Sequence, residues 1–99
     1  MLKKGLTELA KISKECETMM IQEMGKPISE AKEEMEFAVS KDEYFDILAK
    51  ALEPKVHDSS TVFRSPFGVM CLLSPWNFPV DEILLLALPS LASGNTGKT

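Results

Sequence analysis

The chain has 99 residues, of which 44% are hydrophobic, and its 15 acidic and 11 basic side chains give a formal net charge of −4. This length allows one domain at most, and ordering it costs on the order of 150 kcal/mol, so a sizeable buried core is required. The acidic balance argues against nucleic acid, which binds to clustered basic surfaces. The sequence has no apolar run of the roughly 18 residues that a membrane span needs, so it predicts no such span.

The cysteines and the N-terminus indicate the compartment. Cys16 and Cys71 are too few for a disulfide framework, which favours reduced thiols. The first residues carry charge but no continuous apolar region, so they do not resemble a secretory signal. We expect a cytoplasmic protein, and an organellar matrix would fit equally well. The acidic side chains near Glu30 and Glu34 have no histidine beside them, so we predict a solvated helix face and no metal site.

The first third of the chain predicts one amphipathic helix from about Leu2 to Met24. Gly25 should end this helix in a left-handed conformation, and Pro27 prevents it from resuming. The supporting stripe has a 4-3-4-3-4 spacing and consists of Leu2, Leu6, Leu9, Ser13, Cys16 and Met20.

A second helix is predicted from Pro27–Ser29 to about Leu52. The residues Val39–Asp42 weaken its pattern, so a bend or a break is expected there. A polar connector from Glu53 to Ser60 should follow. It contains His57, which has no acidic or cysteine partner at a useful spacing and carries no catalytic signal.

Two short strands should come next. Ser59 to Ser65 is rich in β-prone residues and precedes a proline, which favours a strand. Phe67 to Leu73 is an apolar run between Pro66 and Pro75, and it predicts a short buried strand.

The loop that follows, Ser74-Pro75-Trp76-Asn77-Phe78-Pro79, presents one neutral amide on a stiff backbone. Pro75 and Pro79 fix φ at two points, which holds the side chain between them in place. Asn77 carries two N–H donors, and a donor of this kind aimed at a developing oxyanion contributes about 2.7–4 kcal/mol in the transition state. The alternative is a proline-bracketed turn whose aromatic residues fill a core, with Asn77 bonded to a backbone group.

A third helix is expected over the apolar run from Ile83 to Leu88. Pro79 would be its first residue, and Asp81 and Glu82 would lie in its first turn, at the positive end of the helix dipole. Pro89 would interrupt this helix at a cost of about 3 kcal/mol if it lay in the interior.

The last eight residues, Ala92 to Thr99, come close to a phosphate-binding loop that ends in Gly97-Lys98-Thr99. Such a loop needs a strand before it and a helix that starts at its lysine. This segment follows a helical apolar run instead, so phosphate binding is the remote alternative.

Two motifs give the sequence a family resemblance. The first is Glu23-Met24-Gly25-Lys26-Pro27-Ile28-Ser29-Glu30-Ala31. The second is Pro75-Trp76-Asn77-Phe78-Pro79, preceded by Gly68-Val69-Met70 and followed by Ala87-Leu88-Pro89-Ser90-Leu91-Ala92-Ser93-Gly94-Asn95-Thr96. In this order and at this separation they resemble the aldehyde dehydrogenase superfamily, over nearly the whole chain. Members of that family are several times longer than this chain.

The resemblance implies an α/β fold class. The chain would be a fragment of the aldehyde dehydrogenase fold, with two long N-terminal helices, a short strand pair and then the first strand, loop and helix of a Rossmann-like cofactor domain. As a partial domain it would divide into a helical part, 1–58, and a part with the strand pair, the loop and the helix, 59–99. In the family the first strand belongs to a hairpin arm that is used in subunit contacts. Family members form homo-oligomers and have a proline at the place of Pro89.

The resemblance also implies a reaction and site residues. Aldehyde dehydrogenases oxidise an aldehyde to an acid with NAD or NADP, using a cysteine nucleophile and a glutamate base. Asn77 matches the amide that holds the oxyanion, and Ser74, Pro75 and Trp76 match the cofactor side of the cleft. Cys16 and Cys71 match neither the motif nor the position of the nucleophile, so the chain alone is expected to be inactive.

Two functions remain open. The chain is either the N-terminal part of such an enzyme or a non-catalytic remnant that acts as a packing or oligomerising module. A reading frame that continues past Gly94-Asn95-Thr96 into Val-Val-x-Lys-Pro-like sequence would separate them.

Overall fold

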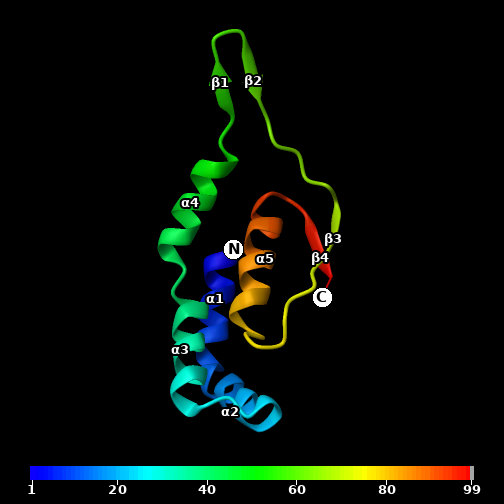
Figure 1. Ribbon diagram of the computed structural model, residues 1–99. Coiled ribbons are helices and arrows are strands. Elements are labelled where there is room, and N and C mark those ends of the chain that lie inside the picture. Colours follow the sequence, from blue (N-terminus) through cyan, green and yellow to red (C-terminus); the bar gives the residue numbers. More distant parts are fainter. Residues whose placement is uncertain (99) are drawn as a thin grey trace.

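The computed structural model describes residues 1–98, which form five helices and four short strands in an elongated, mixed α/β arrangement (Figure 1). The elements are α1 (Leu2–Lys11), α2 (Ser13–Met24), α3 (Ile28–Val39), α4 (Asp42–Leu52), β1 (Lys55–His57), β2 (Ser60–Val62), β3 (Val69–Cys71), α5 (Asp81–Ala92) and β4 (Thr96–Lys98). No helix among these residues is long and apolar enough to cross a membrane.

The predicted first helix is wrong as a single element, because the chain breaks at Ile12. There φ is −105° and ψ is 11°, and the Ile12 N–H donates to the carbonyl of Leu9, a tight turn that ends α1. Leu9 of α1 and Cys16 of α2 nevertheless pack against the same core, so the apolar stripe continues across the break. The prediction for Gly25 is confirmed, since it ends α2 with a left-handed φ of 71°.

The expected break in the second helix is confirmed. α3 ends at Val39 and α4 begins at Asp42, with Ser40 and Lys41 between them. The buried residues of α3 are Ala31, Glu34, Met35 and Ala38, which share one face at helical spacing. The main core forms where this face meets Met20 of α2, and Val80, just before α5, packs against the same cluster. The inner face of α3 therefore contacts both α2 and the start of α5.

A hairpin replaces the predicted polar connector. Residues Lys55–His57 form β1 and pair antiparallel with β2, with Lys55 opposite Val62 and His57 opposite Ser60. All six strand residues are exposed, and the hairpin extends away from the helices in Figure 1. The two strands expected from the sequence consequently do not pair with each other.

The C-terminal third is one β–α–β unit. β3 pairs with β4 in parallel, with Val69 opposite Thr96, and α5 connects the two strands. The prediction of a buried strand is wrong: Val69 and Cys71 are exposed, Val69 by 78%, and Met70 is only partly buried. Helix α5 ends at Ala92 and is followed by a turn and then β4, which is the reverse of the strand, loop, helix order of a phosphate-binding loop. Thr99 lies outside the described residues.

α5 begins at Asp81, not at Pro79 as predicted, and it contains Pro89 in its interior. A proline at this position has no N–H for the carbonyl of the residue four positions earlier, which is Leu85. The hydroxyl of Tyr44 on α4 donates to that carbonyl at 3.3 Å. The Leu85 carbonyl, which Pro89 leaves without an N–H, thus receives a donor from another helix.

Candidate functional site

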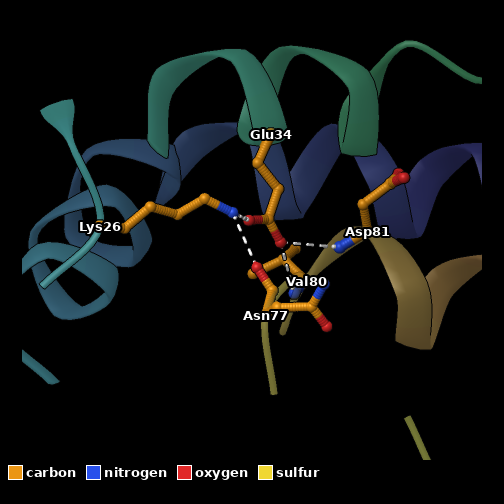
Figure 2. A network of polar contacts seen from close by, with 5 residues as sticks. All are labelled: Lys26, Glu34, Asn77, Val80 and Asp81. Carbon is orange, nitrogen blue, oxygen red and sulfur yellow. Dashed lines mark hydrogen bonds and ion pairs between the residues drawn. The ribbon is translucent and has the colours of Figure 1, made fainter. Parts of the chain in front are cut away.

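The Pro75–Pro79 loop joins β3 to α5 and presents its side chains outward. Trp76 is 79% exposed, and Asn77 and Phe78 are also exposed. The alternative in which the aromatic residues fill a core therefore does not hold for Trp76 in this chain. No described residue hydrogen-bonds to the carboxamide of Asn77, and in Figure 2 this group points away from the polar network beneath the loop.

The backbone of the same residue is held firmly. The Lys26 ammonium donates to the carbonyl oxygen of Asn77 at 3.0 Å. It also lies 4.0 Å from the centre of the Phe78 ring, a distance typical of a cation–π contact. Asn77 thus has an anchored carbonyl and a carboxamide that is available for a ligand.

Lys26 is itself paired with a buried carboxylate. Its Nζ lies 2.5 Å from Oε2 of Glu34, and the two side chains are 5% and 0% exposed. The other carboxylate oxygen, Oε1, accepts from the backbone N–H groups of Val80 at 2.9 Å and Asp81 at 3.2 Å (Figure 2). These donors belong to the start of α5, whose N-cap residue makes no side-chain hydrogen bond. Glu34 therefore caps α5 from another helix, where its negative charge also suits the helix dipole.

The prediction of a solvated acidic face is wrong for Glu34. Its position was nevertheless readable: it lies three residues after Ala31 and four before Ala38, on the apolar face of α3. Lys26 belongs to the first recognised motif, but nothing in the sequence reveals its contact with a loop 51 residues away.

The other candidate residues lie at the start of the same loop. The side chain of Ser74 is partly exposed, and no described residue bonds to its hydroxyl; Pro75 is exposed. Trp76 borders a mostly apolar cavity of about 560 Å³ between the loop and α2. Cys16 lines that cavity on α2, whereas Cys71 is exposed on β3. Within residues 1–98 no group of three or more His, Cys, Asp or Glu residues could hold a metal ion.

The comparison with protein families decides the assignment, because a family model described as "Aldehyde dehydrogenase family" matches residues 1–97. The chain belongs to the aldehyde dehydrogenase family. Both motifs that carry the resemblance meet in the network described above, through the bond from Lys26 to the Asn77 carbonyl.

Curated relatives of this aldehyde dehydrogenase segment have similar names. The D-glyceraldehyde dehydrogenase (NADP(+)) of Thermoplasma acidophilum is 33% identical over 88 residues, which are 83% of this chain and 18% of the relative. The succinate-semialdehyde dehydrogenase [NADP(+)] of Deinococcus radiodurans is 34% identical over 87 residues, with the same two shares. Betaine aldehyde dehydrogenase 1 of rice, Oryza sativa subsp. japonica, is 36% identical over 81 residues, 73% of this chain and 16% of the relative. The chain thus spans about 18% of the length of the first two relatives. No solved structure matches the chain significantly.

Proposed function

We propose that this chain supplies the oxyanion-binding amide and part of the cofactor side of a longer, NAD- or NADP-dependent aldehyde dehydrogenase. The observation that carries the proposal is the difference between the backbone carbonyl and the side-chain carboxamide of Asn77. Its carbonyl is held by Lys26, and its exposed carboxamide is bonded to no described residue. An unoccupied donor on an anchored backbone is what electrostatic stabilisation of an oxyanion requires.

In the proposed reaction a cysteine thiolate attacks the aldehyde carbon, and negative charge develops on the carbonyl oxygen. An N–H of Asn77 donates to that oxygen, and the bond strengthens as the charge grows. The nucleophile and the glutamate base come from residues beyond this segment. Cys16 and Cys71 stay outside the proposal, since one lines the cavity beside α2 and the other lies on β3.

NAD or NADP, when bound, accepts the hydride from the substrate. The residues proposed to face it are Ser74, Pro75 and Trp76. A free hydroxyl on Ser74 and the exposed indole of Trp76 fit a polar, aromatic-ringed ligand of this kind. The names of two relatives specify NADP(+), which makes NADP the first cofactor to test.

The proposal also covers the division of the chain into parts and its contacts with another copy of the enzyme. Residues 1–58 would contain the helical part and β1, and residues 59–99 would contain β2 and the start of a Rossmann-like cofactor domain, built from the β3–α5–β4 unit. The exposed β1–β2 hairpin would contact another copy of the enzyme, because a protruding two-stranded hairpin is marginally stable until it packs against something.

The test uses the full-length protein encoded by the reading frame that contains residues 1–99. It should reduce NADP+ or NAD+ in the presence of an aldehyde, with glyceraldehyde and succinate semialdehyde as the first substrates because the names of the relatives specify them. A folded full-length protein that forms no reduced cofactor with any of a panel of aldehydes would overturn the proposal. A reading frame that ends at Thr99 would do so as well, and would leave the packing or oligomerising module.

A further inference from the structure

We propose that Lys26 and Glu34 are positioning residues for the oxyanion site, acting through the backbone of Asn77. This inference rests on the proposed function, since it concerns how the amide of Asn77 is aimed. It assigns a role to an ion pair whose two side chains are buried.

The first step is the anchor on the upstream side of Pro79. Pro75 and Pro79 fix their own φ angles and restrict the residues before them, so most of the loop's remaining freedom lies at Trp76 and Asn77. The bond from Lys26 to the Asn77 carbonyl fixes the orientation of the peptide plane after Asn77. The contact of Lys26 with the Phe78 ring fixes the next residue. With this plane fixed, fewer directions remain open to the Cα–Cβ bond of Asn77.

The second step is the anchor on the downstream side. Glu34 holds the N–H groups of Val80 and Asp81 with one oxygen and Lys26 with the other. The ion pair therefore hydrogen-bonds to the backbone on both sides of Pro79, at Asn77 and at Val80 and Asp81. Because both side chains lie within a packed interface, small displacements are resisted by the surrounding atoms as well as by the bonds.

The third step is energetic. A buried ion pair is weak evidence for stability, because the cost of desolvating two charges is comparable with their attraction, and apolar replacements are often neutral. Stability alone therefore explains the pair poorly. A second ion pair, between Lys41 and Asp81 at 2.6 Å, also ties α5 to the rest of the chain, and neither of its side chains hydrogen-bonds to a described residue of the Pro75–Pro79 loop. It provides a matched control.

The experiment measures kcat and KM in the full-length enzyme for Lys26→Met, Lys26→Arg and the control Lys41→Met. Lys26→Met should lower kcat about 10- to 100-fold, the scale of a displacement near 1 Å, and leave the KM for NADP+ nearly unchanged. Lys26→Arg, which keeps a cation and donors, should restore part of kcat. Lys41→Met should stay within about twofold of the parent.

A double-mutant cycle separates positioning from general destabilisation. If Lys26 acts through Asn77, then Lys26→Met in the Asn77→Ala background should lower kcat by less than about twofold further. Fully multiplicative effects of the two substitutions would overturn the inference. Asn77→Ala with normal kcat would instead overturn the proposed function, so the two failures are distinguishable.

A second variant guards against simple loss of folding. The double substitution Lys26→Met with Glu34→Gln removes both charges together and keeps an amide oxygen that can accept from the Val80 and Asp81 N–H groups, so the melting temperature should stay near that of the parent. Its kcat should still be reduced, because the anchor on the Asn77 carbonyl is gone. A normal kcat in this variant would contradict the positioning role.

Discussion

At the scale of single residues, two asparagines from the recognised motifs have opposite environments. The carboxamide of Asn77 is exposed and bonded to no described residue, whereas Asn95 is buried and uses both ends of its amide. Asn95 accepts from the Gly68 N–H at 2.9 Å and donates to the carbonyl of Ser90 and the hydroxyl of Ser93. It thereby ties the end of α5 to the start of β3. The contrast supports the role proposed for Asn77 and indicates a structural role for Asn95.

This contrast predicts different stabilities. Asn95→Ala in the full-length protein should lower the free energy of unfolding by about 1–3 kcal/mol, because it leaves the Gly68 N–H without its partner. Differential scanning calorimetry gives the change in melting temperature. Asn77→Ala is the matched control and should leave the melting temperature nearly unchanged. Equal losses at the two positions would show that the Asn77 carboxamide is structural after all.

At the scale of elements, a hydrogen bond from the Tyr44 hydroxyl joins α4 to the Leu85 carbonyl of α5. Tyr44→Phe should lower the free energy of unfolding by about 0.5–1.5 kcal/mol, because the Leu85 carbonyl loses the donor that replaces the missing N–H of Pro89. In a Pro89→Ala background the helix supplies its own donor, so Tyr44→Phe should then cost much less. Urea unfolding of the four proteins completes the cycle. If Tyr44→Phe lowers the free energy of unfolding equally in the Pro89→Ala background, the Tyr44 hydroxyl does not stabilise the chain by replacing the missing N–H of Pro89.

The sequence predicted the elements whose signals are local. Gly25 and the weak stretch from Val39 to Asp42 marked the ends of α2 and α3 because a left-handed residue and a loss of periodicity are properties of a few neighbouring residues. The break at Ile12 stayed hidden, since both helices around it face the same core. The predicted strand from Ser59 to Ser65 contains β2, but β1 was missed because three exposed residues, Lys55–His57, are too few to show an alternating apolar pattern.

For the candidate site, the sequence indicated the loop and Asn77 but not the support beneath them. The proline bracket and the family motif are both contiguous, so they can be recognised without a structure. The contacts of Lys26 and Glu34 with Asn77 and Val80 join residues 46 to 51 positions apart, and they depend on how α3 packs against α5. Tertiary packing of this kind leaves no periodic signal in a single sequence.

At the scale of the whole molecule, the chain buries little of its apolar surface. Its radius of gyration is 16.1 Å, whereas a compact domain of this length has about 13 Å. Seven hydrophobic residues of the described part are buried, and several large ones are open to solvent. The exposed group includes Phe63, Phe67, Val69, Leu73 and Trp76. This shape fits a chain that spans about 18% of the length of its relatives.

The isolated 99-residue chain should therefore aggregate or remain partly molten, because many exposed large apolar side chains promote association. It should bind a hydrophobic dye such as ANS and show a broad thermal transition. A sharp, cooperative transition in a monodisperse monomer would show instead that the segment has a complete core of its own.

The isolated chain should also oxidise no aldehyde, because the covalent route needs a nucleophile and a base that this segment does not supply. The purified chain is assayed for cofactor reduction with the aldehyde panel. Turnover that disappears in Cys16→Ser or Cys71→Ser would identify that thiol as a nucleophile and refute the expectation.

The most direct measurement is the turnover of Asn77→Ala in the full-length enzyme, with Asn77→Asp beside it. Loss of an oxyanion donor should lower kcat about 10²- to 10³-fold, and kcat/KM should fall equally because the interaction strengthens only in the transition state. Asn77→Asp should be at least as slow, since its carboxylate repels the oxyanion while keeping most of the shape. Cofactor binding and the melting temperature should stay near the parent values in both variants. Retention of more than about a third of the parent kcat by Asn77→Ala would contradict the assignment of Asn77 as the oxyanion donor.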